Sequence, residues 1–299
     1  MITTTEVKPA SWRAIVGDYI AMTKPRVMSL LLLTATAGMF LGARGVPGGA
    51  LLAVVLAGGM LASGGASALN MWFEEDLDRR MGRTKARPVA EGRVTPRNAL
   101  LFGITLNILS FVILATWANL LAAGLAMLGT VLYFGLYTVW LKRATVHNIV
   151  IGGAAGAIPP LVGYAAVTGT LHLTAWYLFA IIFFWTPPHF WALALMIKND
   201  YRRAGVPMLP VVRGDRETKL QILLYSVLVA AVSILYYTAD SALGYIYLTG
   251  AAVSGGVLIY MAARLYWNAP RGYAWSLYKF SLLYLAVLFT LVMVDSSVG

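Results

Sequence analysis

Long apolar segments without charged residues dominate this sequence. Of its 299 residues, 60% are hydrophobic and only 12% are charged, which is about half the charged fraction of a typical soluble domain. Runs of roughly eighteen or more nearly uncharged residues are typical of transmembrane helices. We therefore expect an all-α polytopic membrane protein, and the composition excludes a soluble enzyme.

The hydropathy pattern predicts nine transmembrane helices, which together form one transmembrane domain over residues 1–299. The predicted spans are 27–43, 49–72, 98–117, 119–140, 148–168, 173–196, 220–239, 242–265 and 277–295. Every Lys and Arg except Arg44 lies in alternate connections, so all the connections on one face of the membrane are basic. These basic regions are the N-terminal region and the segments 73–97, 141–147, 197–219 and 264–279.

The basic connections also predict the orientation. Cytoplasmic loops are enriched in Lys and Arg, so the basic face, with a short N-terminal tail at 1–20, is expected in the cytoplasm. This tail lacks the apolar core of a signal peptide, which favours a prokaryotic plasma membrane. The net charge of +11 then reflects topology, and no nucleic-acid partner is expected because the basic residues are spread over separate loops. The absence of Cys excludes disulfides and thiolate metal sites.

An acidic cluster follows the second span, in the stretch NMWFEEDLDRRMGRTKARP. On a helix, Asn70, Glu74 and Asp78 share one face because they are four residues apart, whereas the other two acids point elsewhere. Such a stripe suits Mg²⁺, which takes one or two carboxylates and completes its shell with water and phosphate. The alternative is a solvated helix end whose acids pair with nearby arginines. An acid in the bilayer costs about 3 kcal/mol, which favours a functional role.

Basic residues on the same face as this stripe are candidates for binding a diphosphate. Arginine forks and lysine ammonium groups both match phosphate oxygens. The alternative is that they only satisfy the orientation rule, which already demands basic loops here. Beside a metal stripe, the run RTKARPVAEGRV is interpreted as a diphosphate clamp. The candidate diphosphate ligands are Lys24, Arg26, Arg83, Lys85, Arg87, Lys142 and Arg143.

The sixth span carries a proline pair and a histidine. Pro187 and Pro188 predict a break near the middle of this span, because proline removes helical hydrogen bonds. His189 follows directly, between Trp185 and Trp191, and an ionisable residue at membrane depth is by default a functional hypothesis. Imidazole can ligate haem iron or move protons, or it can simply bind a carbonyl that the prolines leave open. GGAAGAIPPLVGY, in the fifth span, predicts a second broken helix.

Several motifs together resemble one family closely. They are TKPRV, NMWFEEDLDRRMGRTKARP, LKRATVHNIVIGGAAGAIPPLVG, WTPPHFWALAL and DYRRAGVPMLPVV, and they run in order from about residue 19 to 215. This combination is similar to the protohaem IX farnesyltransferases, or haem O synthases, of the UbiA superfamily of intramembrane prenyltransferases. The resemblance implies the fold of that superfamily, which is nine transmembrane helices around a central cavity.

The resemblance also implies site residues. In the superfamily, an Asn-x-x-x-Asp-x-x-x-Asp stripe holds Mg²⁺ against a prenyl diphosphate, and Asn70, Glu74 and Asp78 match it, with Glu74 one methylene longer than the usual Asp. A second motif is normally another Asp pair spaced by four. This chain lacks that pair and has His189 and Asp200 in its place, so Asp200 is taken as a further metal ligand and His189, with its two tryptophans, as the haem side.

The implied activity is the conversion of haem B (protohaem IX) to haem O, with Mg²⁺ as cofactor. A farnesyl group passes from farnesyl diphosphate to a haem vinyl group, water adds, and diphosphate is released. The lipid bilayer is the other expected partner, with a downstream haem A synthase or terminal oxidase assembly factor as candidate protein partners. Two alternatives stay open: a relative that prenylates a quinone precursor, chlorin or other lipid acceptor, and a transporter with broken helices and midplane charges.

Overall fold

The computed structural model of the chain describes residues 11–270 and 272–298, and most of this part is helical. The helices are α1 Trp12–Met22, α2 Pro25–Ala43, α3 Gly49–Phe73, α4 Glu75–Arg80, α5 Pro96–Trp117, α6 Leu120–Thr130, the π-helix η1 Val131–Leu141, α7 Lys142–Ala144, α8 Asn148–Gly156, α9 Ile158–Thr168, α10 Leu173–Met196, α11 Lys198–Ala204, α12 Leu209–Val212, α13 Gly214–Ala239, α14 Tyr245–Asn268 and α15 Tyr273–Val298.

Nine helical segments in the described part of the chain are long and apolar enough to cross a membrane, as the sequence predicts. The fourth combines α6, η1 and α7, and the fifth combines α8 and α9. The seventh begins at Gly214 rather than at residue 220, because the charged turn that precedes the apolar run is already helical. Likewise, the N-terminal tail expected at 1–20 contains the start of α1 at Trp12, whereas residues 1–10 lie outside the described part.

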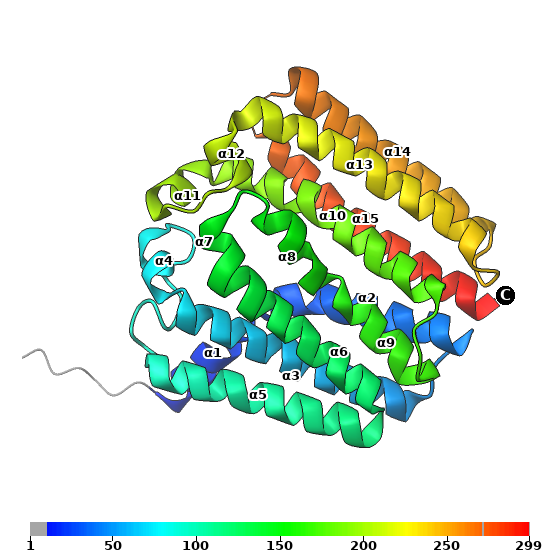
Figure 1. Cartoon of the computed structure of the whole chain (residues 1–299), viewed down its shortest axis with the longest axis horizontal. Helices are drawn as coiled ribbons and strands as arrows, with labels where there is room; N and C mark the ends of the chain where they lie inside the picture. Colours follow the sequence, from blue (N-terminus) through cyan, green and yellow to red (C-terminus); the bar gives the residue numbers. More distant parts are fainter. Residues whose placement is uncertain (1–10, 271, 299) are drawn as a thin grey trace, which may run out of the picture.

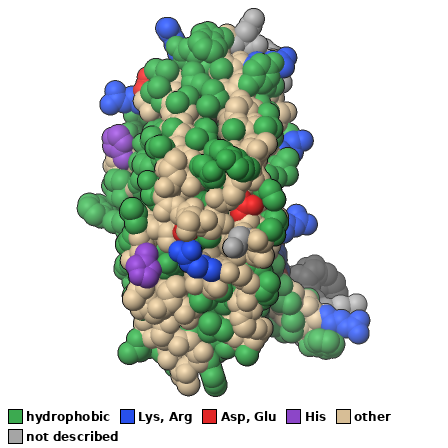
Figure 2. Space-filling view, turned by 90° about the vertical axis from the view of Figure 1, so that its right-hand side faces the viewer, with side chains coloured by type: hydrophobic (Ala, Val, Ile, Leu, Met, Phe, Trp, Pro, Cys, Tyr) green, Lys and Arg blue, Asp and Glu red, His purple; other side chains and the backbone are tan. Residues whose placement is uncertain are grey.

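The long helices run roughly side by side, with α4, α7 and α11 at one end of the bundle and the C-terminal end of α15 at the other (Figure 1). The end opposite α4 and α11 shows mostly apolar and uncharged side chains, with few basic ones (Figure 2). On α5, large apolar side chains such as Leu101, Ile108 and Val112 stay exposed, as expected for a surface in contact with lipid. The basic, loop-rich end is therefore the end at which polar ligands can approach.

Close contact between α2 and α9 holds the middle of the bundle together. A Cβ added at Gly38 would overlap the Pro160 carbonyl oxygen, and one at Gly163 would overlap the Ala35 carbonyl oxygen. At Gly42, one turn beyond Gly38, an added Cβ would make a tight contact with the Tyr164 carbonyl oxygen at 3.3 Å. Glycines at such spacing allow transmembrane helices to approach until their backbones touch.

The two proline-rich spans differ from each other. The fifth span is interrupted at Ala157, between α8 and α9, as GGAAGAIPPLVGY predicts. In contrast, α10 is continuous through Pro187 and Pro188, so the predicted break there is wrong. The φ angle of proline is itself helical, and the helix is held against α15 on either side of the pair: the Trp185 indole N–H donates to the Ser281 carbonyl oxygen at 2.7 Å.

Candidate active site

The predicted stripe stays on one face although the helix changes at Glu74. α3 ends at Phe73 and α4 begins at Glu75, yet the backbone keeps its helical pairing across the junction. The Glu74 N–H donates to the Asn70 carbonyl oxygen at 2.9 Å, and the Asp78 N–H donates to that of Glu74 at 2.8 Å. As a result Asn70, Glu74 and Asp78 are all buried, at 2%, 1% and 2% exposure.

Each member of the stripe binds one cation from a different part of the chain. Lys142 of α7 donates to both Glu74 carboxylate oxygens, at 2.5 and 2.6 Å. Nη1 of Arg87, from the loop after α4, contacts both oxygens of Asp78 at 2.8 Å. Nζ of Lys24 donates to the Asn70 side-chain oxygen at 3.1 Å. The stripe therefore lies at a junction of three basic segments.

Cations outnumber acids at this junction. Glu74 and Asp78 each pair with one basic side chain, whereas the third basic group, the Lys24 amine, meets only a neutral amide. Burial, followed by the nearby positive charge of Arg87, holds the pKa of Lys24 well below its usual 10.5. Lys24 also has a left-handed backbone, with φ 51°, a strain that clusters at functional sites. An anion bound here would supply the missing negative charge.

The other acids of the cluster point outward, as the helical phase predicts. Asp76 is 47% exposed and pairs with Arg143 at 2.7 Å, and Glu75 pairs with Arg79 one turn later. Partial burial would raise the pKa of Asp76, but the hydrogen bonds and charge of Arg143 outweigh it and lower the pKa. These acids form the solvated helix end that was the alternative interpretation, whereas the stripe does not.

Of the seven predicted diphosphate ligands, the structure brings three together at the stripe: Lys24, Arg87 and Lys142. Arg26, Arg83 and Lys85 are exposed, and their side chains form no hydrogen bond or ion pair with the described residues. Arg143 is committed to Asp76, with its guanidinium 5.3 Å from the Phe73 ring centre.

Asp200 lies near the stripe but outside it. Its carboxylate pairs with Arg203 on the same helix, and a Cβ added at Gly82 would meet it at 3.4 Å. The two long loops of the basic face therefore touch, as α4 and α11 also do in Figure 1. Within the described residues, no three His, Asp or Glu side chains gather closely enough to form a metal site by themselves, so a metal here depends on the amide of Asn70 and on the substrate.

His189 is enclosed between α10 and α15. It is 5% exposed, its ring stacks between Trp185 and Tyr278 at 4.4 and 4.5 Å, and Nδ1 hydrogen bonds with the Ser281 hydroxyl at 2.8 Å. The partner of Nδ1 is thus a hydroxyl on another helix rather than a carbonyl left open by the prolines. This clamp holds α10 to α15.

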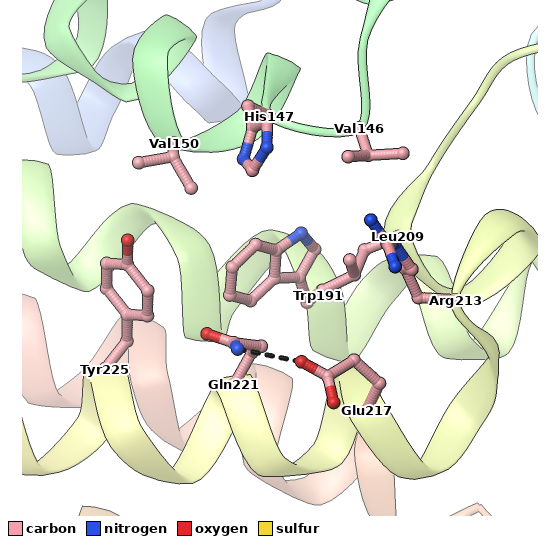
Figure 3. A pocket seen from close by; sticks show the side chains of 9 residues that line it. All are labelled: Val146, His147, Val150, Trp191, Leu209, Arg213, Glu217, Gln221 and Tyr225. Atoms are coloured by element: carbon pink, nitrogen blue, oxygen red, sulfur yellow. Dashed lines mark hydrogen bonds between the residues drawn. The ribbon is translucent and has the colours of Figure 1, made fainter.

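Trp191 is not part of that clamp, although the sequence groups it with His189. It lies on another face of α10 and meets Tyr225 of α13 edge-on at 5.5 Å. There it borders a cavity of about 570 Å³ at the basic end of α8, α10 and α13 (Figure 3). The structure therefore separates the three predicted haem-side residues into two places.

Several residues that complete these sites carry no signal in the sequence. Thr138 of η1 accepts a hydrogen bond from the Asn70 amide at 3.1 Å and donates to the Tyr133 carbonyl oxygen at 2.9 Å. π-Helices often mark functional sites, but VLYFGLYTVWL reads as an ordinary apolar span. Ser281 and Tyr278 were missed for the same reason, since only the fold brings α15 to His189.

Comparison with known proteins places the chain in a family. The model of the UbiA prenyltransferase family matches residues 31–287. A protoheme IX farnesyltransferase of Thermus thermophilus is 54% identical over 97% of this chain and 47% of the relative. The enzyme of the same name from Deinococcus radiodurans is 50% identical over 97% of this chain and 95% of the relative.

The chain spans about half the length of the first of these relatives and nearly all of the second. Among solved structures, a UbiA homologue from Archaeoglobus fulgidus bound to GPP and Mg²⁺ superposes with a TM-score of 0.69 at 14% identity, covering 92% of this chain and 99% of that one. This likeness shows the shared fold. From its sequence and its fold, the chain belongs to the UbiA prenyltransferase family.

Proposed function

We propose that this protein transfers a farnesyl group from farnesyl diphosphate to a vinyl group of haem B, with addition of water, and so forms haem O and diphosphate. The relatives named protoheme IX farnesyltransferase, at 50% and 54% identity, support this choice of substrates. The observation that carries the proposal is the buried stripe with its surplus of cations. In a solvated helix end the acids would be exposed, whereas Asn70, Glu74 and Asp78 are each at most 2% exposed.

The residues of the stripe fit Mg²⁺. Two carboxylates and an amide oxygen are hard donors of the kind that Mg²⁺ combines with substrate phosphates, and the UbiA homologue from A. fulgidus is bound to GPP and Mg²⁺. Asn70, Glu74 and Asp78 would hold the ion, and Asp200, which pairs with Arg203 in the structure, would have to move toward them to become a further ligand. Bound there, Mg²⁺ would neutralise charge on the departing diphosphate.

The chain's own cations have a separate task. As the allylic C–O bond breaks, negative charge grows on the diphosphate oxygens, and fixed positive groups stabilise that charge more than they stabilise the substrate. Lys24, Arg87 and Lys142 lie where they can do this without a large movement, because each already contacts a ligand of the proposed ion. They hold the diphosphate and orient it.

Aromatic rings next to the stripe suit the allylic cation that forms when the diphosphate leaves. Trp72 and Phe73 immediately precede Glu74, and their ring centres lie 6.1 and 6.0 Å from that of Phe134 of η1. Ring faces stabilise a nearby positive charge, and an apolar wall excludes the water that would quench an allylic cation. We assign these rings to the farnesyl side, and His189 and Trp185 to the acceptor side.

One experiment tests the proposed reaction. Purified protein is incubated with Mg²⁺, farnesyl diphosphate and haem B, and the products are separated by chromatography and mass spectrometry. We expect haem O with Mg²⁺ and none after chelation. Prenylation of a quinone precursor or chlorin instead of haem would overturn the acceptor, and no prenyl transfer to any acceptor would overturn the reaction class in favour of a transporter.

A further inference from the structure

A cavity separate from the stripe opens between α8, α10 and α13. Its volume of about 570 Å³ is within the range of small-molecule sites, roughly 300–1,000 Å³. Figure 3 shows His147 and Val150 facing Trp191 across it, with α13 along one side. The lining residues are Val146, His147, Val150, Trp191, Leu209, Arg213, Glu217, Gln221 and Tyr225.

The Trp191 indole N–H points to a missing hydrogen-bond acceptor. Trp191 is 3% exposed, and its Nε1 has no partner among the described residues. Buried donors without partners are rare, because each carries an uncompensated desolvation cost. In Figure 3 the indole borders the cavity with its nitrogen on the side of His147 and Val146. A ligand with an acceptor oxygen in the cavity would satisfy this donor.

The cavity changes from charged to apolar along its length. Arg213, Glu217, Gln221 and Tyr225 line it at four-residue spacing and so share one face of α13. Over these three turns, about 18 Å, the lining passes from Arg213, exposed at the membrane boundary, to Tyr225 inside the span. Within the described residues Arg213 has no ion-pair partner. A ligand with an anionic group at one end and a largely apolar body would match this lining.

This cavity is close to the stripe. Lys142, which binds Glu74, and His147, which lines the cavity, are separated by five residues, a distance of at most about 18 Å even for an extended chain. The cavity and the stripe therefore lie toward the same end of the bundle, where the basic connections are.

We propose that the cavity binds the propionate edge of the acceptor haem, an inference that rests on the proposed function. Arg213 pairs with a propionate, and the Trp191 N–H donates to a propionate oxygen. The macrocycle lies along Trp191 and Val150, and the vinyl groups, on the far side of the ring from the propionates, point into the span. Glu217 does not bind haem; it accepts a hydrogen bond from the Gln221 amide at 2.9 Å.

The test compares variants of two charged residues, Arg213 and Glu217, that lie on one face of α13. Haem is titrated into purified protein without farnesyl diphosphate and followed by its absorption spectrum. Arg213→Gln should weaken haem binding roughly ten- to a hundredfold and Trp191→Phe about tenfold, as expected for hydrogen bonds to a charged group. Glu217→Gln, four residues from Arg213, should leave binding unchanged or tighten it, and Arg216→Gln, which removes a cation that does not line this cavity, should leave it unchanged.

A modified ligand checks the chemistry. Haem dimethyl ester lacks both carboxylates, so Arg213→Gln should weaken binding of haem but not of the ester. Equal losses for haem and ester, or equal losses in Arg213→Gln and Glu217→Gln, would overturn the proposal because they indicate a general loss of structure. Unchanged haem binding in Arg213→Gln and Trp191→Phe would also overturn it.

A failure of this site can be distinguished from a failure of the proposed function. Wild-type protein that forms haem O, while Arg213→Gln and Trp191→Phe keep wild-type haem affinity and KM, leaves the function standing and removes this site. Wild-type protein that neither binds haem nor forms haem O removes both. A cavity that takes an anionic lipid head group instead would show haem binding independent of Arg213 and sensitive to added anionic lipid, which also overturns the proposal.

Discussion

Lys142 and Arg143 are neighbours in the sequence, yet they bind acids in very different surroundings. The Lys142–Glu74 pair is 13% and 1% exposed, whereas the Arg143–Asp76 pair is 38% and 47% exposed. Removing one partner of a buried pair costs about 3–5 kcal/mol, because a bare charge stays buried, and an exposed pair contributes only about 0–1 kcal/mol. We expect Lys142→Gln to lower the free energy of unfolding by several kcal/mol and Arg143→Gln to change it little.

Thermal unfolding of the two purified variants in the same detergent measures this difference. Added inorganic diphosphate provides a second readout, since it should stabilise wild-type protein and Arg143→Gln but not Lys142→Gln. Equal unfolding temperatures for both variants would contradict the burial of the Lys142–Glu74 pair.

Asp78 and Asp76 offer a matched comparison of catalytic roles. Both are aspartates in α4, but Asp78 is buried against Arg87 and Asp76 faces solvent. We expect Asp78→Asn to lower turnover about a hundredfold or more, the typical effect of losing one charge-stabilising group, and to raise the Mg²⁺ requirement. Asp76→Asn should cost much less. Glu74→Asp, which restores the usual family residue, should be tolerated, whereas Glu74→Gln should not.

A Mg²⁺ titration of each variant's initial rate distinguishes these cases. A raised Mg²⁺ requirement in Asp76→Asn but not in Asp78→Asn would refute the assignment of the stripe, and equal small losses in all variants would mean that the cluster has no catalytic role.

For single residues, the sequence predicts correctly what depends only on local spacing along a helix. Four-residue steps placed Asn70, Glu74 and Asp78 on one face, because that relation depends only on helix geometry. Their partners could be proposed only as a set of seven cations. Which three of them reach the stripe depends on contacts between segments as far apart as Lys24 and Asn70, and no local pattern encodes such contacts. For the same reason, the sequence analysis grouped Trp191 with His189, although Trp191 packs against α13 and His189 against α15.

Among the helices, α2 and α9 approach each other so closely that only glycine fits at the contact. A methyl group at Gly163 would overlap the Ala35 carbonyl oxygen, whereas one at Gly124 of α6 would meet nothing within 4 Å. We expect Gly163→Ala to push the helices apart and destabilise the protein by about 1–3 kcal/mol or more. Gly124→Ala should be neutral or stabilise it by up to about 1 kcal/mol, because alanine is the better helix former.

The midpoint of thermal unfolding, measured for both variants under identical conditions, checks this pair. A Gly163→Ala protein as stable as Gly124→Ala would contradict the close approach of α2 and α9.

The sequence predicts the helices well where hydropathy alone determines them, and poorly where packing against other helices determines their form. The nine spans follow from runs of apolar residues, because lipid imposes that requirement on every segment. The π-helix η1 and the unbroken α10 do not follow from it. In α10, anchoring of Trp185 and His189 to Ser281 outweighs the tendency of Pro187 and Pro188 to interrupt a helix.

For the molecule as a whole, the clearest expectation concerns orientation. The basic loops and the stripe share one end of the bundle, and α15 ends at the other (Figure 1). We expect the loop around Gly92 in the cytoplasm and the chain after Val298 outside, because positive loops stay inside. Gly299 itself lies beyond the described residues. Reporter fusions at these two positions test the arrangement. If both lie on the same side, the number of spans between them is even, and the prediction of nine spans is wrong.

The α2–α9 contact also bears on how the protein is made. Gly163 follows Gly38 by about 125 residues, so at roughly 5–20 residues per second the ribosome needs about 6–25 s to deliver the partner of the first span. α15, which also packs against α2, arrives later still. During this interval α2 has α3 beside it but lacks α9 and α15, its other two neighbours. Its Thr34 and Thr36 hydroxyls donate to the Leu31 and Leu32 carbonyl oxygens of the same helix, so these polar groups need no partner while synthesis continues.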